Sequence, residues 1–376
     1  MRSDAEAHCK TVKHLAPACF EAFACVAGNC PDSCCRAGWE IIPDAETLSR
    51  YQSLPGAAGD RVRAGIVPGA EPLLRQDVAR VCVLLDPDGL CCVQRSFGHA
   101  ALCRVCREYP RFHREFGGLT EHGISLSCPT AYGLAVSAPP AWREWEDDAP
   151  PVPNELDPEQ YLRLRRGRAL ALSLLEREEQ PPERRLLLLR RLATAIQTAP
   201  ERRLRHDYAL RLRRWTTLPR HKRQQTLAVD YAELARQFLK LEILSPDWEK
   251  ALRRFAAKAE AGELSPAPVQ GEACIRWLWY SLYKYWLDAL DDGALLARVD
   301  RSLIMALLGA EMDLTLPGEG PFLRRLSREV EHCEENLSAL LQLCRAEQGK
   351  LSRLLKIQKK TRRKSEKSID KATLFR

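Results

Sequence analysis

The second half of the chain carries apolar residues at helical spacing. From Asp157 onward, Leu and Ala recur three and four positions apart among Arg and Glu, and prolines separate the segments. This pattern predicts an all-α region. The predicted helices lie near 158–178, 182–198, 201–215, 222–244, 247–260, 271–291, 293–309 and 321–346.

The first 137 residues follow a different pattern, in which short apolar stretches alternate with turn sequences. Helical spacing is scarce there apart from residues 44–52, for which Asp44 is the predicted N-cap. The predicted fold class is therefore mainly α, with a small Cys-rich irregular metal-binding N-terminal domain followed by an all-α helical domain. The predicted parts are a Cys-rich domain at 1–137, a linker rich in proline and acidic residues at 138–158, a helical domain at 159–349 and a basic tail at 350–376.

The net charge of +8 comes from the C-terminal end of the chain. Residues 350–376 hold eleven Lys and Arg against two acidic residues, so the rest of the chain is close to neutral. No aromatic residues are interleaved with the basic run to stack on bases, so we expect a solvated tail and no nucleic-acid partner. The first residues lack the apolar core of a signal peptide, and the apolar runs are too short to span a bilayer. We therefore expect a cytoplasmic protein with no membrane partner.

Twelve of the fifteen cysteines lie in the first 128 residues. In a reducing cytosol, such a group indicates metal binding or redox chemistry rather than disulfides. The spacing is uneven, which favours an iron-sulfur cluster over zinc, although zinc stays open as the alternative. Cys92 is expected to be spare, and the remaining cysteines outside the ligand set are expected to be ordinary thiols. The predicted metal ligands are Cys25, Cys30, Cys34, Cys35, Cys82, Cys91, Cys103, Cys106 and Cys128.

Four segments of the chain together carry a family resemblance. They are FACVAGNCPDSCCRAGW at 23–39, CVLL at 82–85 with GLC at 89–91, CREYPR at 106–111 with residues 121–129, and SREVEHCEEN at 327–336. They resemble the flagellin lysine N-methylase family. The resemblance implies a protein-lysine N-methyltransferase that carries a 4Fe-4S cluster, uses S-adenosylmethionine as cosubstrate and methylates the ε-amine of lysines on flagellin, its protein partner.

The fourth segment supplies candidate catalytic residues. Helical spacing places Arg328, His332 and Glu335 on one face, with Glu331 beside it. A lysine must lose a proton before it attacks a methyl sulfonium, so His332 or Glu331 is the candidate base. A polar helix face with intrahelical pairs explains the same residues equally well. The aromatic residues between 277 and 286 are expected to pack in the core rather than to form a cage for the sulfonium.

Two other functions stay open at this point. One is a non-enzymatic iron-sulfur or zinc metalloprotein that acts as a redox sensor or a partner-binding scaffold. The other is an RNA-binding protein built like a zinc ribbon, which metal content would distinguish. The chain has no glycine-rich nucleotide-binding motif, so the residues that bind S-adenosylmethionine are not assigned.

Overall fold

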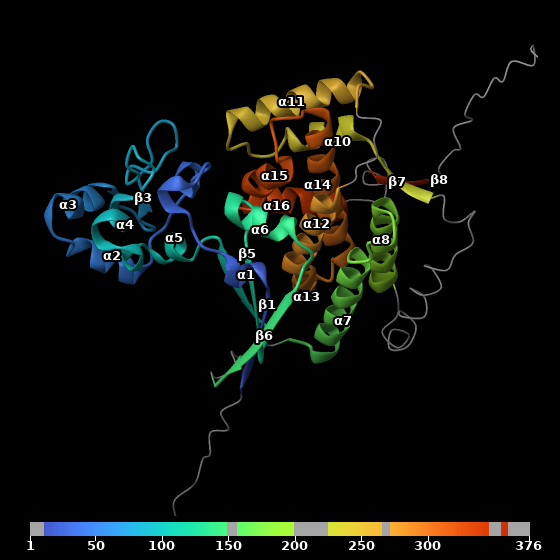
Figure 1. Ribbon diagram of the computed structural model, residues 1–376, viewed down its shortest axis with the longest axis horizontal. Coiled ribbons are helices and arrows are strands. Elements are labelled where there is room, and N and C mark those ends of the chain that lie inside the picture. The colour runs from blue at the N-terminus through green and yellow to red at the C-terminus, as the bar shows by residue number, and fades with distance from the viewer. Residues whose placement is uncertain (1–10, 149–155, 199–224, 265–270, 346–354, 360–376) are drawn as a thin grey trace, which may run out of the picture.

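The protein has two unequal parts joined by a small sheet. The computed structural model describes residues 11–148, 156–198, 225–264, 271–345 and 355–359. A cysteine lobe, which we define as residues 25–108, lies beside a larger helical body, and the sheet lies at their junction (Figure 1). The predicted mainly α fold class is confirmed. Within the described ranges, no helix has the length and apolar character needed to cross a membrane.

The cysteine lobe is built from short elements. Asp44 begins its first helix as predicted, because the carboxylate accepts the amide of Thr47 at 2.9 Å. The same carboxylate accepts the amide of Arg104 at 3.0 Å, so one side chain holds two helix starts together. The elements are η1 (Ala27–Asn29), η2 (Cys34–Arg36), α2 (Ala45–Gln52), α3 (Gly56–Ala64), β2 (Ile66–Val67), β3 (Leu73–Leu74), α4 (Cys92–Phe97), η3 (His99–Ala101) and α5 (Arg104–Glu108).

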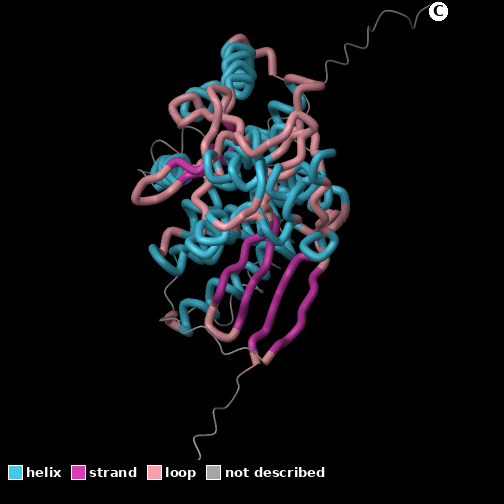
Figure 2. Tube along the Cα trace, turned by 90° about the vertical axis from the view of Figure 1, so that its left-hand side faces the viewer, coloured by secondary structure: helices cyan, strands magenta, loops and turns pink. Residues whose placement is uncertain are grey.

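A four-stranded sheet flanks the lobe in sequence and was not predicted. Its order is β4-β5-β1-β6, and β1 runs parallel to β5 and antiparallel to β6 (Figure 2). The partners are distant in the chain, since Lys13 lies opposite Leu119. Every residue of β6 is exposed, so no alternating pattern marks that strand. The bounds are β1 (Val12–Pro17), β4 (Arg111–Glu115), β5 (Leu119–Ile124) and β6 (Trp142–Asp147), with the short α1 (Cys19–Ala22) after β1.

The helical body is arranged around α14 (Leu295–Thr315), which packs against α8, α12, α15 and α16. Gly309 permits the close approach of α15, because a Cβ there would lie 2.8 Å from Leu323 Cδ2. The other helices are α6 (Pro129–Ser137), α7 (Pro158–Leu175), α8 (Pro182–Thr198), α10 (Tyr231–Phe238), α11 (Pro246–Glu260), α12 (Glu272–Tyr285), η6 (Trp286–Asp288), α13 (Ala289–Asp292), α15 (Phe322–Val330) and α16 (Glu334–Arg345).

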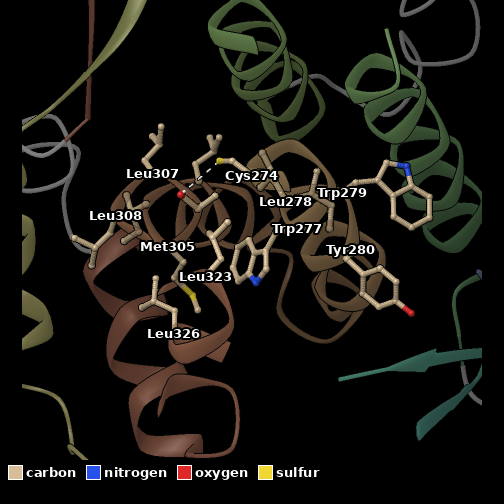
Figure 3. Close-up of a cluster of buried hydrophobic side chains, with 14 of the residues drawn as sticks. Cys274, Trp277, Leu278, Trp279, Tyr280, Met305, Leu307, Leu308, Leu323 and Leu326 are labelled. Carbon is tan, nitrogen blue, oxygen red and sulfur yellow. Dashed lines mark hydrogen bonds between the residues drawn. The ribbon is translucent and has the colours of Figure 1, made fainter. Parts of the chain in front are cut away.

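The aromatic side chains of α12 form part of the core, as predicted. Trp277 and Trp279 are almost fully buried: Trp277 lies beside apolar side chains of α14 and α15, and Trp279 points to the opposite side of α12 (Figure 3). Their polar atoms have protein partners: Trp277 Nε1 donates to Ser327 Oγ at 3.0 Å, and the Tyr280 hydroxyl accepts the amide of Ile124 at 3.1 Å. Such satisfied, buried rings are structural and leave no open cage for a cation.

Two of the predicted helices are wrong in detail. Residues 225–229 form β7 (Gln225–Val229), which pairs antiparallel with β8 (Leu355–Lys359), and Asp230 then begins α10 by accepting the amide of Glu233 at 3.0 Å. The helix predicted at 321–346 is broken between Val330 and Glu334 into α15 and α16. The helix predicted at 201–215 lies outside the described residues.

The break between α15 and α16 has a tertiary cause. Glu329 accepts the amides of Leu244 and Ser245, at 2.9 and 3.3 Å. Asn336 accepts the amide of Glu242 at 2.8 Å. These bonds fix the loop before α11 against both helix ends, and the sequence of 321–346 alone contains no sign of them.

The buried apolar residues form two groups. The smaller lies within the lobe around Tyr51, Leu84 and Leu102. The larger includes Ile124 and Cys128 together with the helical body. The division of the chain into four parts stays a prediction. Strand β6 lies inside the predicted linker, and β8 lies inside the predicted tail. The structure does not describe the other residues of that tail.

Candidate metal centre

All nine predicted metal ligands line one pocket of about 340 Å³ in the cysteine lobe. Cys92, predicted to be spare, does not line it and is buried in the apolar group of the lobe. Among the other cysteines predicted to be ordinary thiols, Cys274 donates to the carbonyl of Ala306 and Cys9 lies outside the described residues. The structure therefore gathers thiols that span more than 100 positions of sequence. The nine are Cys25, Cys30, Cys34, Cys35, Cys82, Cys91, Cys103, Cys106 and Cys128.

The first cysteine motif forms a compact loop. The amide of Cys30 donates to Ala27 O at 3.0 Å, and Ser33 begins the next turn by accepting the amide of Cys35 at 3.2 Å. This loop packs closely on the one that precedes Cys91. A Cβ on Gly89, whose φ is +85°, would lie 3.0 Å from Gly28 O. Glycine at 89 therefore lets the two cysteine-bearing loops meet.

Three of the thiols lie at the starts of helices. Cys91 precedes α4, Cys103 precedes α5 and Cys128 precedes α6. The pKa of Cys91 is lowered to about 6, because the Cys92 thiol donates to it and the amides of Gln94 and Val93 add to that effect. Backbone amides at a helix start favour the thiolate, which is the form that binds metals.

The donor set fits a thiophilic metal. Sulfur donors suit iron-sulfur clusters and zinc, and uncharged thiols must lose protons to bind either. His99 also lines the pocket and was not assigned from the sequence, because it does not lie at ligand spacing from the cysteines. Burial raises the pKa of Cys82 to about 11, so metal binding there must displace a proton.

A second pocket, of about 230 Å³, lies between the lobe and α15. Asp32 lines both pockets and accepts hydrogen bonds from Arg324 and Arg328. Burial alone would raise the pKa of Asp32, but the two arginines hold it below its usual value. Sequence reasoning missed Asp32, although it lies inside the first cysteine motif. The basic residues of this arginine pocket are Arg36, Arg80, Arg324, Arg325 and Arg328.

His332 lies in the turn between α15 and α16, not on a helix face as predicted. Its Nε2 is 2.8 Å from Ser127 Oγ and 3.2 Å from Ser125 Oγ. Its ring packs against Trp39 at a tilt of 34°, with the centroids 4.1 Å apart. Burial, and then the charge of Lys284, lower the pKa of His332 to about 4. The ring is therefore neutral at pH 7.

The side chain of Glu331 points toward α12. Its carboxylate accepts Lys284 Nζ at 2.6 Å and the Tyr285 hydroxyl at 3.0 Å. Burial alone would raise its pKa, but the charge of Lys284 lowers it overall. Neither Glu331 nor His332 lines the cysteine pocket in the part of the chain that the structure describes. Glu331 thus lies in a buried ion pair with α12, whereas His332 faces the lobe.

A hydrogen-bonded path connects His332 to the cysteine pocket. Ser127 Oγ, which bonds His332, is 2.9 Å from the Tyr109 hydroxyl, and Tyr109 lines the pocket. Burial raises the pKa of Tyr109, so its hydroxyl is protonated. The structure therefore joins the predicted base and the predicted metal ligands through two side chains that sequence reasoning missed.

The site defines a protein with a thiol-lined metal pocket attached to a helical body. In sequence, the chain is similar to the flagellar biosynthetic protein FliU of Salmonella muenchen, with 29% identity over 143 residues that cover 35% of this chain and 82% of that protein. It is equally similar, at 29% identity over 143 residues, to the lysine-N-methylases of Salmonella typhimurium and Salmonella choleraesuis. The predicted resemblance to the flagellin lysine N-methylase family is thereby confirmed.

The similarity has limited extent. It covers about a third of the length of each lysine-N-methylase, 34%, and 35% of this chain. No protein-family profile matches the chain, and no solved structure matches it.

Proposed function

We propose that this protein is a lysine N-methyltransferase that uses S-adenosylmethionine to methylate the ε-amine of lysines on flagellin, and that its cysteine pocket holds a 4Fe-4S cluster. The similarity to proteins named lysine-N-methylase carries the proposal. The thiol-lined pocket supports its metal part, because it gathers more thiolate donors than a single zinc ion takes.

The transfer requires an uncharged lysine amine. The amine nitrogen attacks the methyl carbon, the carbon-sulfonium bond breaks, and S-adenosylhomocysteine leaves while one lysine proton passes to a base. His332 is neutral, as a base must be before it accepts this proton, but its lowered pKa also makes it a weak base. Glu331 is already paired with Lys284. The geometry therefore favours His332 over Glu331 as the base.

The surroundings of His332 suit a cationic methyl donor. Trp39 and Tyr109 pack beside it as tilted rings, with centroids 4.1 and 5.9 Å from that of the imidazole. Aromatic faces attract a sulfonium. The arginine pocket lies on the same side of the lobe, shares Asp32 with the cysteine pocket and suits the carboxylate of the cosubstrate.

A 4Fe-4S cluster in the cysteine pocket would be held by thiolates of four of the nine cysteines. When bound, such a cluster supplies electron transfer and folding energy to the lobe. The protein contributes the rest: helix starts that favour thiolates at Cys91, Cys103 and Cys128, and the buried Tyr109 and Ser127 that orient His332.

The test is a methylation assay under anaerobic conditions. Metal-loaded protein, monomeric flagellin and S-adenosylmethionine with a labelled methyl group are mixed, and mass spectrometry locates labelled lysines. We expect His332→Ala to lower kcat by about 10²–10⁴-fold, the usual effect of a general base, with its metal content unchanged. Glu334→Gln, an exposed neighbour, should retain full activity.

Each other outcome has a definite meaning. No labelled lysine with metal-loaded protein and several flagellins would contradict the methyltransferase and favour a metalloprotein that senses redox state or binds a partner. Full activity of His332→Ala would leave methyl transfer in place and remove His332 from the site.

A further inference from the structure

The cysteine pocket holds more thiols than one metal centre uses. A structural zinc ion takes four ligands, and a 4Fe-4S cluster takes four cysteines. Nine cysteines line this single pocket. A single centre of either kind would leave about five of them without a metal role, in a lobe whose own apolar group is small.

One set of four thiols lies toward the helical body. Cys128 belongs to the large apolar group and begins α6. Its thiol neighbours Cys30 and Cys25, and Cys34 neighbours both Cys25 and Cys128. Three of these cysteines come from the first loop of the lobe, and the fourth lies at the start of α6.

A second set of four belongs to the apolar group of the lobe. Cys82, Cys91, Cys103 and Cys106 all pack in that group, which does not include Cys128. Cys82 neighbours Cys91 and Cys103. Cys103 and Cys106 are joined by a hydrogen bond across one turn of helix, and Cys106 also neighbours Cys34 of the first set and Cys35.

The two sets meet at the ninth thiol. Cys35 follows Cys34 in sequence, and the two thiols share a hydrogen bond. The amide of Cys82 donates to the carbonyl of Cys35 at 2.9 Å. Cys35 therefore lies between a member of the first set and a member of the second.

We propose that the pocket holds two adjacent metal centres. Cys25, Cys30, Cys34 and Cys128 bind the first, and Cys82, Cys91, Cys103 and Cys106 bind the second, with Cys35 between them. The proposal goes beyond methyl transfer and does not depend on it, because the metal content is measured without flagellin or S-adenosylmethionine.

The first test counts metal in the wild-type protein. Protein purified anaerobically is assayed for iron, acid-labile sulfide and zinc per chain. We expect two centres: roughly eight irons and eight sulfides for two 4Fe-4S clusters, or roughly two zinc ions. A fully loaded protein with only four irons, or with one zinc ion, would overturn the proposal.

The second test separates the two sets. Cys128→Ser and Cys103→Ser should each lose about half of the metal, and the double variant nearly all of it. Cys344→Ser, which removes a thiol of α16 that does not line the pocket, should keep the wild-type content. A folded single variant, judged by circular dichroism, that has lost all metal would mean that the thiols serve one shared centre. The wild-type count decides the question even where a variant fails to fold.

Discussion

The cysteine lobe and the helical body reach stability by different means. Among the described residues, the body buries more than fifty apolar side chains in one continuous group, whereas the lobe buries nine. A core of nine residues contributes little free energy against the cost of ordering more than eighty residues. The lobe instead presents eight thiols to one pocket, and Cys128 at the start of α6 supplies the ninth. The comparison supports the proposed metal centre, which would stabilise the lobe as apolar packing stabilises the body.

Removal of the metal should have the largest effect, and it should affect the lobe rather than the body. We expect an anaerobic chelator to unfold the lobe and to leave the body folded, because structural metal contributes folding energy directly. Hydrogen exchange followed by mass spectrometry checks this. Amides of α2 and α3 should lose protection, while those of α14 should keep it. Equal loss in α3 and α14 would show that lobe and body unfold as one unit.

Glu331→Gln should lower the unfolding free energy of the body and leave that of the lobe unchanged. The change breaks the buried pair with Lys284, in which the glutamate side chain is 4% exposed, and should cost about 2–4 kcal/mol of unfolding free energy. Denaturant titration of tryptophan fluorescence measures it. Glu249→Gln, which breaks an exposed pair with Arg253, should cost less than about 1 kcal/mol. An equal cost for both changes would mean that the Lys284 pair is not buried in solution.

The extent of successful prediction differs between these regions. Composition and local spacing selected nine thiols that the structure places around one pocket, and metal binding by them stays a prediction. The cap at Asp44 was identified from its position before a helical period. Both depend on neighbours in sequence. The sheet was missed because β1 pairs with β5 about 100 positions away, and the turn at His332 because Glu329 and Asn336 bond a distant loop. Features that arise from tertiary contacts leave little local signal.

Asp44→Ala should destabilise the lobe by about 1–2 kcal/mol, since it removes one helix cap and the bond to Arg104. Backbone amides, above all that of Arg104, hold the pKa of Asp44 below its usual value. This stabilisation is therefore fully present above the pKa of the unfolded state, near 4, and is lost progressively as the pH falls from there through the lower pKa of the folded state. The difference in thermal stability between wild type and variant should therefore be constant from pH 7 to pH 5 and should begin to narrow by pH 3. A difference that stays constant down to pH 3 would contradict the assigned cap.

The smallest expected effect is a loss of stability at low pH that comes from two histidines. Burial, and the charges of His113 and His14, lower the pKa of His122 to about 4, and His332 has a similar value. Because the unfolded rings take up protons near pH 6.5, stability should fall as the pH drops from 6.5 toward 4. NMR titration of the imidazole carbons should find both rings neutral at pH 5.5. A midpoint near 6.5 for either ring would contradict the lowered pKa of that histidine.

The identity of the metal tests the account most directly, because both the stability of the lobe and the proposed site depend on it. Anaerobically purified protein should be brown and contain iron and acid-labile sulfide in equal amounts, as thiolate-bound iron-sulfur clusters do. Stoichiometric zinc without sulfide would contradict the iron-sulfur assignment. A protein that binds neither metal and keeps a folded lobe would contradict the central claim that metal stabilises this part of the chain.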